Sequence, residues 1–167
     1  NDVSLRMVAK NELPKGLGYV QSKPATAFAP VAVTLDELGD AWDNGRVRLT
    51  VQSAVNGRKV GMCDAGADMA FHFGQLIAHV SQTRPVRAGT VIGGGAVSNA
   101  PTENNGKKEW PKGASCLLEK RAIETLLDGK ASTEYLKVSD TVRIDVKGKD
   151  GQSIFGAIDQ HVAPLAS

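Results

Sequence analysis

The chain has 167 residues, of which 41% are apolar and 23% are charged, and its formal net charge is +2. These values are typical of one globular domain with a substantial core and argue against a disordered chain. The longest apolar runs are too short to span a bilayer, and no basic run with interleaved aromatic residues suggests a nucleic-acid partner. Two cysteines are too few for a disulfide framework, so a reduced, cytoplasmic protein is expected.

The first part of the chain predicts short strands separated by turns. The pattern of apolar and polar residues indicates strands at residues 1–9, 29–34 and 46–52. A polar turn at residues 35–38 follows Thr34, which is a suitable capping residue. Asn56-Gly57 comes after the third strand and is the strongest short signal for a β-hairpin.

An amphipathic helix is predicted next. Apolar residues recur at helical spacing, at Phe73, Leu76, Ile77 and Val80. Asp68 or a neighbour would cap the N-terminus of this helix, and Arg84-Pro85 would end it.

The second half of the chain predicts a mainly β arrangement. A buried strand at residues 89–98 leads into a polar surface loop, expected to be an insertion without secondary structure, at residues 99–114. Residues 116–125 fit either a strand or a helix. A second hairpin would join strands at 141–146 and 153–158 through a turn at 149–151. The prediction is therefore one α+β, mainly β domain over residues 1–167.

Several motifs have ordinary structural explanations. Gly93, Gly94 and Gly95 lack the lysine and hydroxyl residue of a phosphate-binding loop, and a tight turn explains them better. His72 and His79 lie seven positions apart on the predicted helix, whereas two metal ligands on one helix are usually four apart. No Gly-x-Ser-x-Gly motif and no Cys-x-x-Cys motif occurs.

The assembled segments resemble the fumarylacetoacetate hydrolase superfamily, and within it the fumarylacetoacetase branch. The resemblance covers almost the whole chain and depends on the order and spacing of segments at 1–6, 21–30, 33–39, 65–69, 73–79, 88–95, 135–140 and 154–158. It implies a β-roll or sandwich of mixed sheets with helical additions. It also implies a homodimer that acts on a small β-diketo acid with Mg²⁺, or with Ca²⁺ or Mn²⁺.

The resemblance also implies roles for individual residues. Asp2 matches a metal-ligating aspartate, and Lys23 matches a lysine that lies beside the metal and stabilises the departing enolate. Glu119 matches a glutamate that orients a histidine base. The turn at Gly94, Gly95 and Ala96 would line the substrate cavity. A cation and an ammonium group are suited to this chemistry, because C–C cleavage of a diketone develops enolate charge.

Two departures from the family pattern stand out. The Glu-x-Glu pair that supplies further metal ligands is absent, and the expected histidine base would also lie upstream of Asn1. The chain is therefore expected to be the C-terminal half of the enzyme. In addition, Ala96 replaces a threonine that touches substrate in the family.

The functional prediction is a metal-dependent hydrolase that cleaves a C–C bond of a 2,4-diketo acid such as fumarylacetoacetate, in the breakdown of tyrosine or other aromatic compounds. Acylpyruvate hydrolysis, oxaloacetate decarboxylation and dienoate hydration remain alternatives, since they share a metal-chelated enolate. A non-catalytic homologue is a further alternative, which the loss of a hydroxyl at Ala96 favours.

Overall fold

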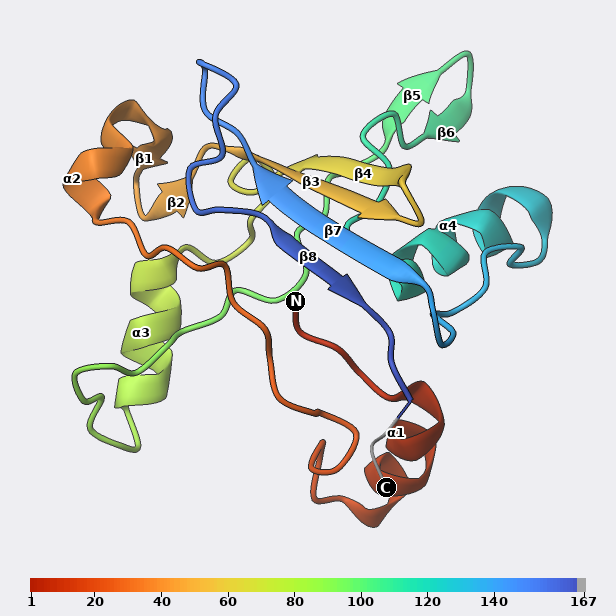
Figure 1. Cartoon of the computed structure of the whole chain (residues 1–167), viewed down its shortest axis with the longest axis horizontal. Coiled ribbons are helices and arrows are strands. Elements are labelled where there is room, and N and C mark those ends of the chain that lie inside the picture. Colours follow the sequence, from red (N-terminus) through yellow and green to blue (C-terminus); the bar gives the residue numbers. More distant parts are fainter. Residues whose placement is uncertain (165–167) are drawn as a thin grey trace.

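A four-stranded antiparallel sheet forms the centre of the computed structural model, which describes residues 1–164 (Figure 1). The strand order is β4-β3-β7-β8, with β4 at Arg58–Asp64, β3 at Thr50–Val55, β7 at Thr141–Val146 and β8 at Ile158–His161. The sheet, two further short hairpins and a few helices confirm the predicted α+β, mainly β class. Because β3 and β7 are neighbours, the two predicted hairpins join into one sheet.

The strand predicted at residues 46–52 is divided in the structure. Arg46–Val47 form β2, which pairs with β1 at Trp42–Asp43, and β3 begins only at Thr50. Between them, the Arg48 N–H donates to the Ala41 carbonyl at 2.7 Å, and the Leu49 carbonyl accepts from the Ala65 N–H at 2.9 Å. The two residues bond to different segments, which ends one ladder before the next begins.

Residues 1–9 were predicted as a strand, and that prediction is wrong. Helix α1 spans Arg6–Glu12 and continues into the 3₁₀ turn η1 at Leu13–Lys15. Met7 is 76% exposed, so the apolar alternation in this segment does not mark a buried strand face. The local bond from the Ala9 N–H to the Leu5 carbonyl, at 2.9 Å, satisfies the backbone within the segment.

Two other predicted strands are absent from the described structure. Residues 29–34 are irregular, and Pro30 there has no N–H to contribute to a ladder. Residues 89–98 are also irregular, and Gly89 and Gly95 there adopt φ values of +86° and +80°, outside the region of regular strands. The turn predicted at residues 35–38 is the one-turn helix α2 (Leu35–Leu38), and the 3₁₀ turn η2 (Gly39–Ala41) follows it.

The predicted amphipathic helix is confirmed as α3, at Phe73–Ser81. Its N-cap is His72 rather than Asp68. The His72 Nδ1 atom accepts from the Gln75 N–H at 3.3 Å, and the Gln75 Oε1 atom accepts from the His72 N–H at 3.0 Å. This reciprocal pair is a capping box built with histidine, which a search for Ser, Thr, Asp or Asn does not find.

The chain between α3 and β7 contains more structure than the sequence predicts. Residues 99–114 were expected to be a loop, yet they include a small hairpin, β5 (Thr102–Asn104) with β6 (Lys107–Glu109). The ambiguous segment at 116–125 is a helix, α4 (Leu117–Asp128). The second predicted hairpin is present, although its returning strand is β8 rather than residues 153–158.

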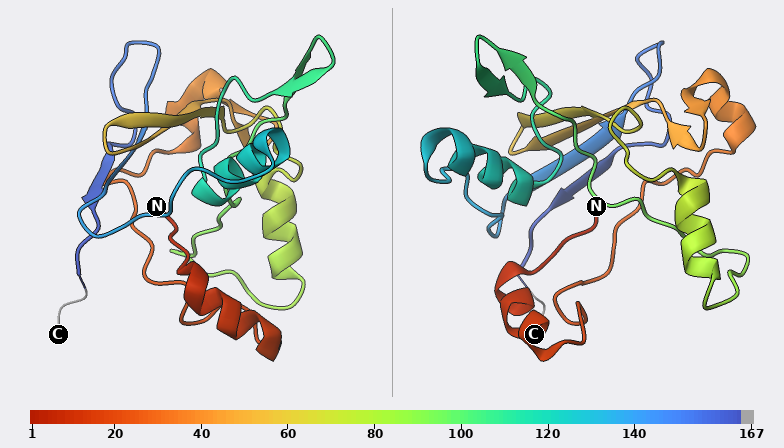
Figure 2. Two further views of the ribbon diagram at one scale, coloured as in Figure 1. Left: turned by 90° about the vertical axis from the view of Figure 1, so that its right-hand side faces the viewer. Right: turned by 180° about the vertical axis from the view of Figure 1, so that it is seen from behind.

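The two faces of the sheet differ in polarity. Antiparallel partners share a face, and the pairs Gln52↔Asp145 and Ala54↔Arg143 place polar side chains on one side. The pairs Val51↔Cys63 and Val51↔Val146 make the other side apolar. Helices α1 and α3 lie on one side of the sheet and apart from each other (Figure 2). Among the described residues, the apolar side chains classed as buried are Ala9, Cys63 and Ala114, so much apolar surface stays accessible.

Asn56 joins the first hairpin to β7. It has a φ of +51°, its Nδ2 atom donates to Asp140 Oδ1 at 2.8 Å, and its Oδ1 atom accepts from the Thr141 N–H at 2.8 Å. Asn105, at a φ of +50°, makes no side-chain hydrogen bond to a described residue. Asn56 and Asn105 share a backbone conformation. They differ because the Asn56 side chain is tethered to Asp140 and Thr141 by these hydrogen bonds.

We expect Asn56→Ala to lower the free energy of unfolding by about 2 kcal/mol, because it removes two hydrogen bonds as well as a residue suited to positive φ. Asn105→Ala, which changes only the backbone preference, should cost clearly less. Urea denaturation followed by circular dichroism measures both. Equal losses would show that the Asn56 tether contributes nothing.

Candidate functional site

The N-terminal segment folds back so that Asp2 and Lys23 meet. Lys23 Nζ lies 2.7 Å from Asp2 Oδ1 and donates to Ser4 Oγ at 3.0 Å. The hydrogen bond from Lys23 is the main reason that the pKa of Asp2 lies below its ordinary value. The Lys23 side chain is 29% exposed and that of Asp2 is 64% exposed, so the ammonium group is the more enclosed of the two.

Glu12 holds the loop that returns Lys23 to this position. Its carboxylate accepts from three successive backbone N–H groups, at 3.1 Å from Val20, 2.5 Å from Gln21 and 3.1 Å from Ser22. It also accepts from the Ser22 hydroxyl at 2.5 Å. That hydroxyl is the largest cause of the lowered pKa of Glu12, which is about 2. A helix residue therefore fixes the backbone immediately before Lys23.

Backbone bonds attach this segment to the rest of the chain. The Leu5 N–H donates to the Ser22 carbonyl at 2.8 Å, and the Asn1 amino group donates to the Ala27 carbonyl at 2.6 Å. Asn1 Nδ2 donates to Gln160 Oε1 on β8 at 3.0 Å. The pair formed by Asp2 and Lys23 is thus positioned relative to the central sheet.

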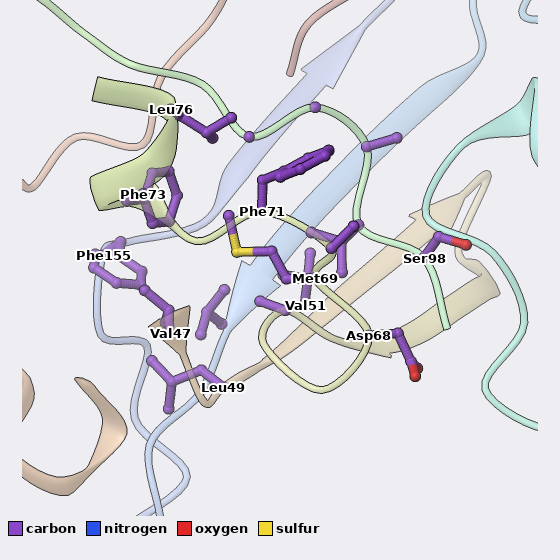
Figure 3. Close-up of a pocket in the computed structure, with 17 residues that line it drawn as sticks. Val47, Leu49, Val51, Asp68, Met69, Phe71, Phe73, Leu76, Ser98 and Phe155 are labelled. Carbon is purple, nitrogen blue, oxygen red and sulfur yellow. The ribbon is translucent and has the colours of Figure 1, made fainter. Parts of the chain in front are cut away.

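A cavity of about 400 Å³ lies against the apolar side of the sheet (Figure 3). Its lining includes the predicted residues Gly94, Gly95 and Ala96. The other lining residues are mostly apolar, and they are Val47, Leu49, Val51, Ala65, Asp68, Met69, Ala70, Phe71, Phe73, Leu76, Val97, Ser98, Val146 and Phe155. Asp2, Lys23 and Glu119 are not among them.

The segment that forms one wall of this cavity has no strand partner, and side chains hold it instead. Asn99 is 6% exposed, and its Nδ2 atom donates to the Asp64 carbonyl at 3.1 Å and to Asp68 Oδ2 at 2.9 Å. Its Oδ1 atom accepts from the Asp64 N–H at 2.8 Å. The Ala100 N–H donates to Asp68 at 3.0 Å. These bonds connect two walls of the cavity, 64–68 and 94–100.

Glu119 approaches the same wall from behind. Its Oε1 atom accepts a hydrogen bond from the Ser98 hydroxyl, while its Oε2 atom is buried without a hydrogen-bond partner among the described residues. Residues 112–114 run along the edge of β4, where Gly61 and Gly113 let the backbones approach closely, and α4 follows. No histidine in the described chain bonds to Glu119, so the predicted histidine partner is not found in residues 1–164.

The metal-binding capacity of these residues is incomplete. Asp2 is the one predicted carboxylate ligand, and the described residues contain no cluster of three or more His, Cys, Asp or Glu side chains suited to a metal ion. Mg²⁺ requires near-octahedral oxygen coordination. The described residues therefore do not form a full Mg²⁺ site, and further ligands would be needed to complete it.

Comparison with known proteins decides the family. A family model described as fumarylacetoacetate (FAA) hydrolase C-terminal matches residues 1–163. The chain belongs to the fumarylacetoacetate hydrolase family. A search of curated proteins finds no match. Members of this family are generally enzymes with hydrolase or lyase-type functions, and they commonly use divalent metals. No helix in residues 1–164 has the length and apolar character to cross a membrane.

Sequence reasoning missed several residues that shape this hydrolase-family site. Glu12 and Asn99 were not predicted to have a role, Asp68 was expected to cap a helix, and Ser98 was placed in a buried strand. The sequence offered one signal for these residues, the run of small and polar residues at 94–100. Such a segment packs poorly as a buried strand, so side chains must supply hydrogen bonds that hold it in place.

The clamp formed by Glu12 predicts a pH dependence. The stability that the clamp contributes is fully present above the ordinary glutamate pKa of 4.5. It is lost as the pH falls through about 2, because the pKa of Glu12 is lowered in the folded state. Hydrogen exchange should therefore show the Val20, Gln21 and Ser22 amides still protected at about pH 3. Glu12→Gln keeps only one acceptor oxygen and should reduce this protection at every pH, whereas Glu37→Gln, on an exposed turn, should leave it intact. Unchanged protection in Glu12→Gln would contradict the clamp.

The Asn99 bonds predict a localised loss of stability. Asn99→Ala leaves polar groups at residue 64 without partners, and we expect it to lower the free energy of unfolding by about 1–3 kcal/mol. Limited proteolysis should show faster cleavage within residues 94–98. Asn104→Ala removes only one exposed bond to Glu109 and is the control. Similar losses of unfolding free energy in the two variants would contradict the role assigned to the Asn99 hydrogen bonds.

Proposed function

We propose that this chain supplies part of the active site of a metal-dependent hydrolase that cleaves the C–C bond of a 2,4-diketo acid. The observation that carries the proposal is the enclosed Lys23 ammonium group, held by Asp2 and Ser4. The membership of the chain in the fumarylacetoacetate hydrolase family supports it. Acylpyruvates, which are 2,4-diketo acids, and the related β-diketo acid fumarylacetoacetate are the compounds to assay first.

The reaction requires a group that stabilises developing negative charge. Water adds to the acyl carbonyl, the bond to the central carbon breaks, and the electron pair leaves on an enolate that is then protonated. A positive group aimed at the enolate oxygen lowers the energy of the transition state. We assign this role to Lys23, because Ser4 and Asp2 fix the position of its Nζ atom.

A divalent cation, when bound, would polarise the diketone oxygens. Asp2 can contribute one carboxylate to such an ion, which is less than a complete site. Glu119 is proposed to orient the base that activates water. Its Oε2 atom is buried without a hydrogen-bond partner among the described residues and can therefore accept a hydrogen bond from such a base.

Lys23→Ala tests the assignment. We expect kcat to fall by more than about tenfold with Mg²⁺ and an acylpyruvate, because a charge directed at a transition state is worth at least that much. KM should change less than kcat. Lys10→Ala removes the same charge from an exposed position on α1 and should leave both constants unchanged. A smaller loss of kcat in Lys23→Ala would remove Lys23 from the mechanism.

A further inference from the structure

We infer that the cavity beneath the sheet binds the acyl substituent of the substrate and selects an uncharged, apolar one. This inference rests on the proposed function and narrows it. A compound such as fumarylacetoacetate carries a second carboxylate on its acyl group and would be disfavoured. The argument depends on the chemistry of the cavity wall and on its position.

The wall presents no positive charge. Of the described residues that line the cavity, none is Lys, Arg or His, and only Asp68 and Ser98 have polar side chains. Both direct their oxygens away from the apolar residues (Figure 3). Asp68 Oδ2 accepts from both Asn99 and Ala100, and the Ser98 hydroxyl donates to Glu119. A ligand therefore meets carbon and sulfur over most of this surface.

Two carboxylates at the cavity wall have the wrong sign for a carboxylate ligand. The guanidinium of Arg46 also lies beside the wall, but its Nε atom donates to the carbonyl of Met69 at 3.3 Å. The N–H of Ala100 is the main cause of the lowered pKa of Asp68, which keeps that carboxyl ionised at neutral pH. Glu119 lies directly behind Ser98. A carboxylate entering the cavity would lose hydration without gaining a partner and would approach these two groups. Burial of an unpaired charge is strongly unfavourable.

The apolar residues are arranged to receive a ligand. Val51 and Val146 lie on the apolar face of the sheet, and Phe71 is 63% exposed although it lines the cavity. A volume of about 400 Å³ falls within the range of small-molecule sites. An alkyl or aryl group would cover this accessible apolar surface and remove it from water.

The cavity is also close to the segment that carries Asp2. The views in Figures 1 and 2 show the N-terminal segment passing beside the irregular chain that runs from α3 to β5. That irregular chain includes Gly94, Gly95 and Ala96, which form one wall of the cavity. In the proposed complex, a diketo acid held at Lys23 would direct its acyl group toward this apolar surface.

Two matched substrates test the selection. Pentanoylpyruvate has an uncharged butyl tail, and its analogue carries a carboxylate in place of the terminal methyl group. With Mg²⁺, we expect the full-length protein to show at least about tenfold higher kcat/KM for the uncharged compound, as apolar pockets discriminate strongly against unpaired polar groups. Met69→Lys, in the cavity, should reduce this ratio. Met62→Lys, on the polar face of the sheet, should not change it. Equal rates or a preference for the dicarboxylate would overturn the inference and leave the proposed function intact.

A binding measurement separates this inference from the proposed reaction. The chain contains three methionines, Met7, Met62 and Met69, and only Met69 lines the cavity. In a spectrum of carbon-13 methyl-labelled methionine, methyl hexyl ketone should shift the Met69 signal and leave the other two in place. The same ketone with a terminal carboxylate should shift none. Absence of a Met69 shift with the uncharged ketone overturns the inference whether or not any diketo acid is cleaved.

Discussion

The hydrogen bonds of the Asn99 side chain are the constraint on which the cavity depends. The segment at 94–100 contains Gly95 at a positive φ and belongs to no strand, so it cannot satisfy its backbone in a ladder. The buried Asn99 amide instead connects the segment to residues 64–68, by bonding to both backbone groups of Asp64 and to the Asp68 carboxylate. Without this connection, nothing in the local conformation of the segment would keep it facing the apolar side of the sheet.

Glu12 holds the irregular segment in the other part of the site. The loop at 20–22 also lacks a ladder, and one carboxylate collects its three N–H groups and a hydroxyl. In both places, one side chain bonds an irregular segment to another part of the chain. The irregular backbone brings unusual groups into position, and the clamps supply the rigidity that a functional site needs.

The two parts of the site have opposite electrostatic character. Lys23 provides an enclosed positive charge beside an exposed carboxylate, whereas the cavity is apolar with carboxylates behind its wall. In the proposed reaction this division matches the two ends of a diketo acid, because enolate charge develops at one end while an acyl substituent fills the other. Membership in the fumarylacetoacetate hydrolase family is shown, and the division of charge is what connects this chain's own residues to a substrate.

The sequence by itself determined the family, the α+β class, the hairpin at Asn56-Gly57, helix α3 and the strand β7, because each depends on local periodicity, turn chemistry or the order of motifs. It also predicted that Asp2, Lys23 and the 94–96 turn belong to the site, although their roles await the experiments above. Only the tertiary structure decided that residues 1–9 contain a helix, that residues 89–98 form no strand, and that Glu12 and Asn99 hold the two parts of the site. The helix and the missing strand follow from backbone conformations that the apolar pattern does not reveal. The Glu12 and Asn99 bonds depend on partners in other segments of the chain. A single hydrogen bond across such a separation leaves no periodic pattern to read.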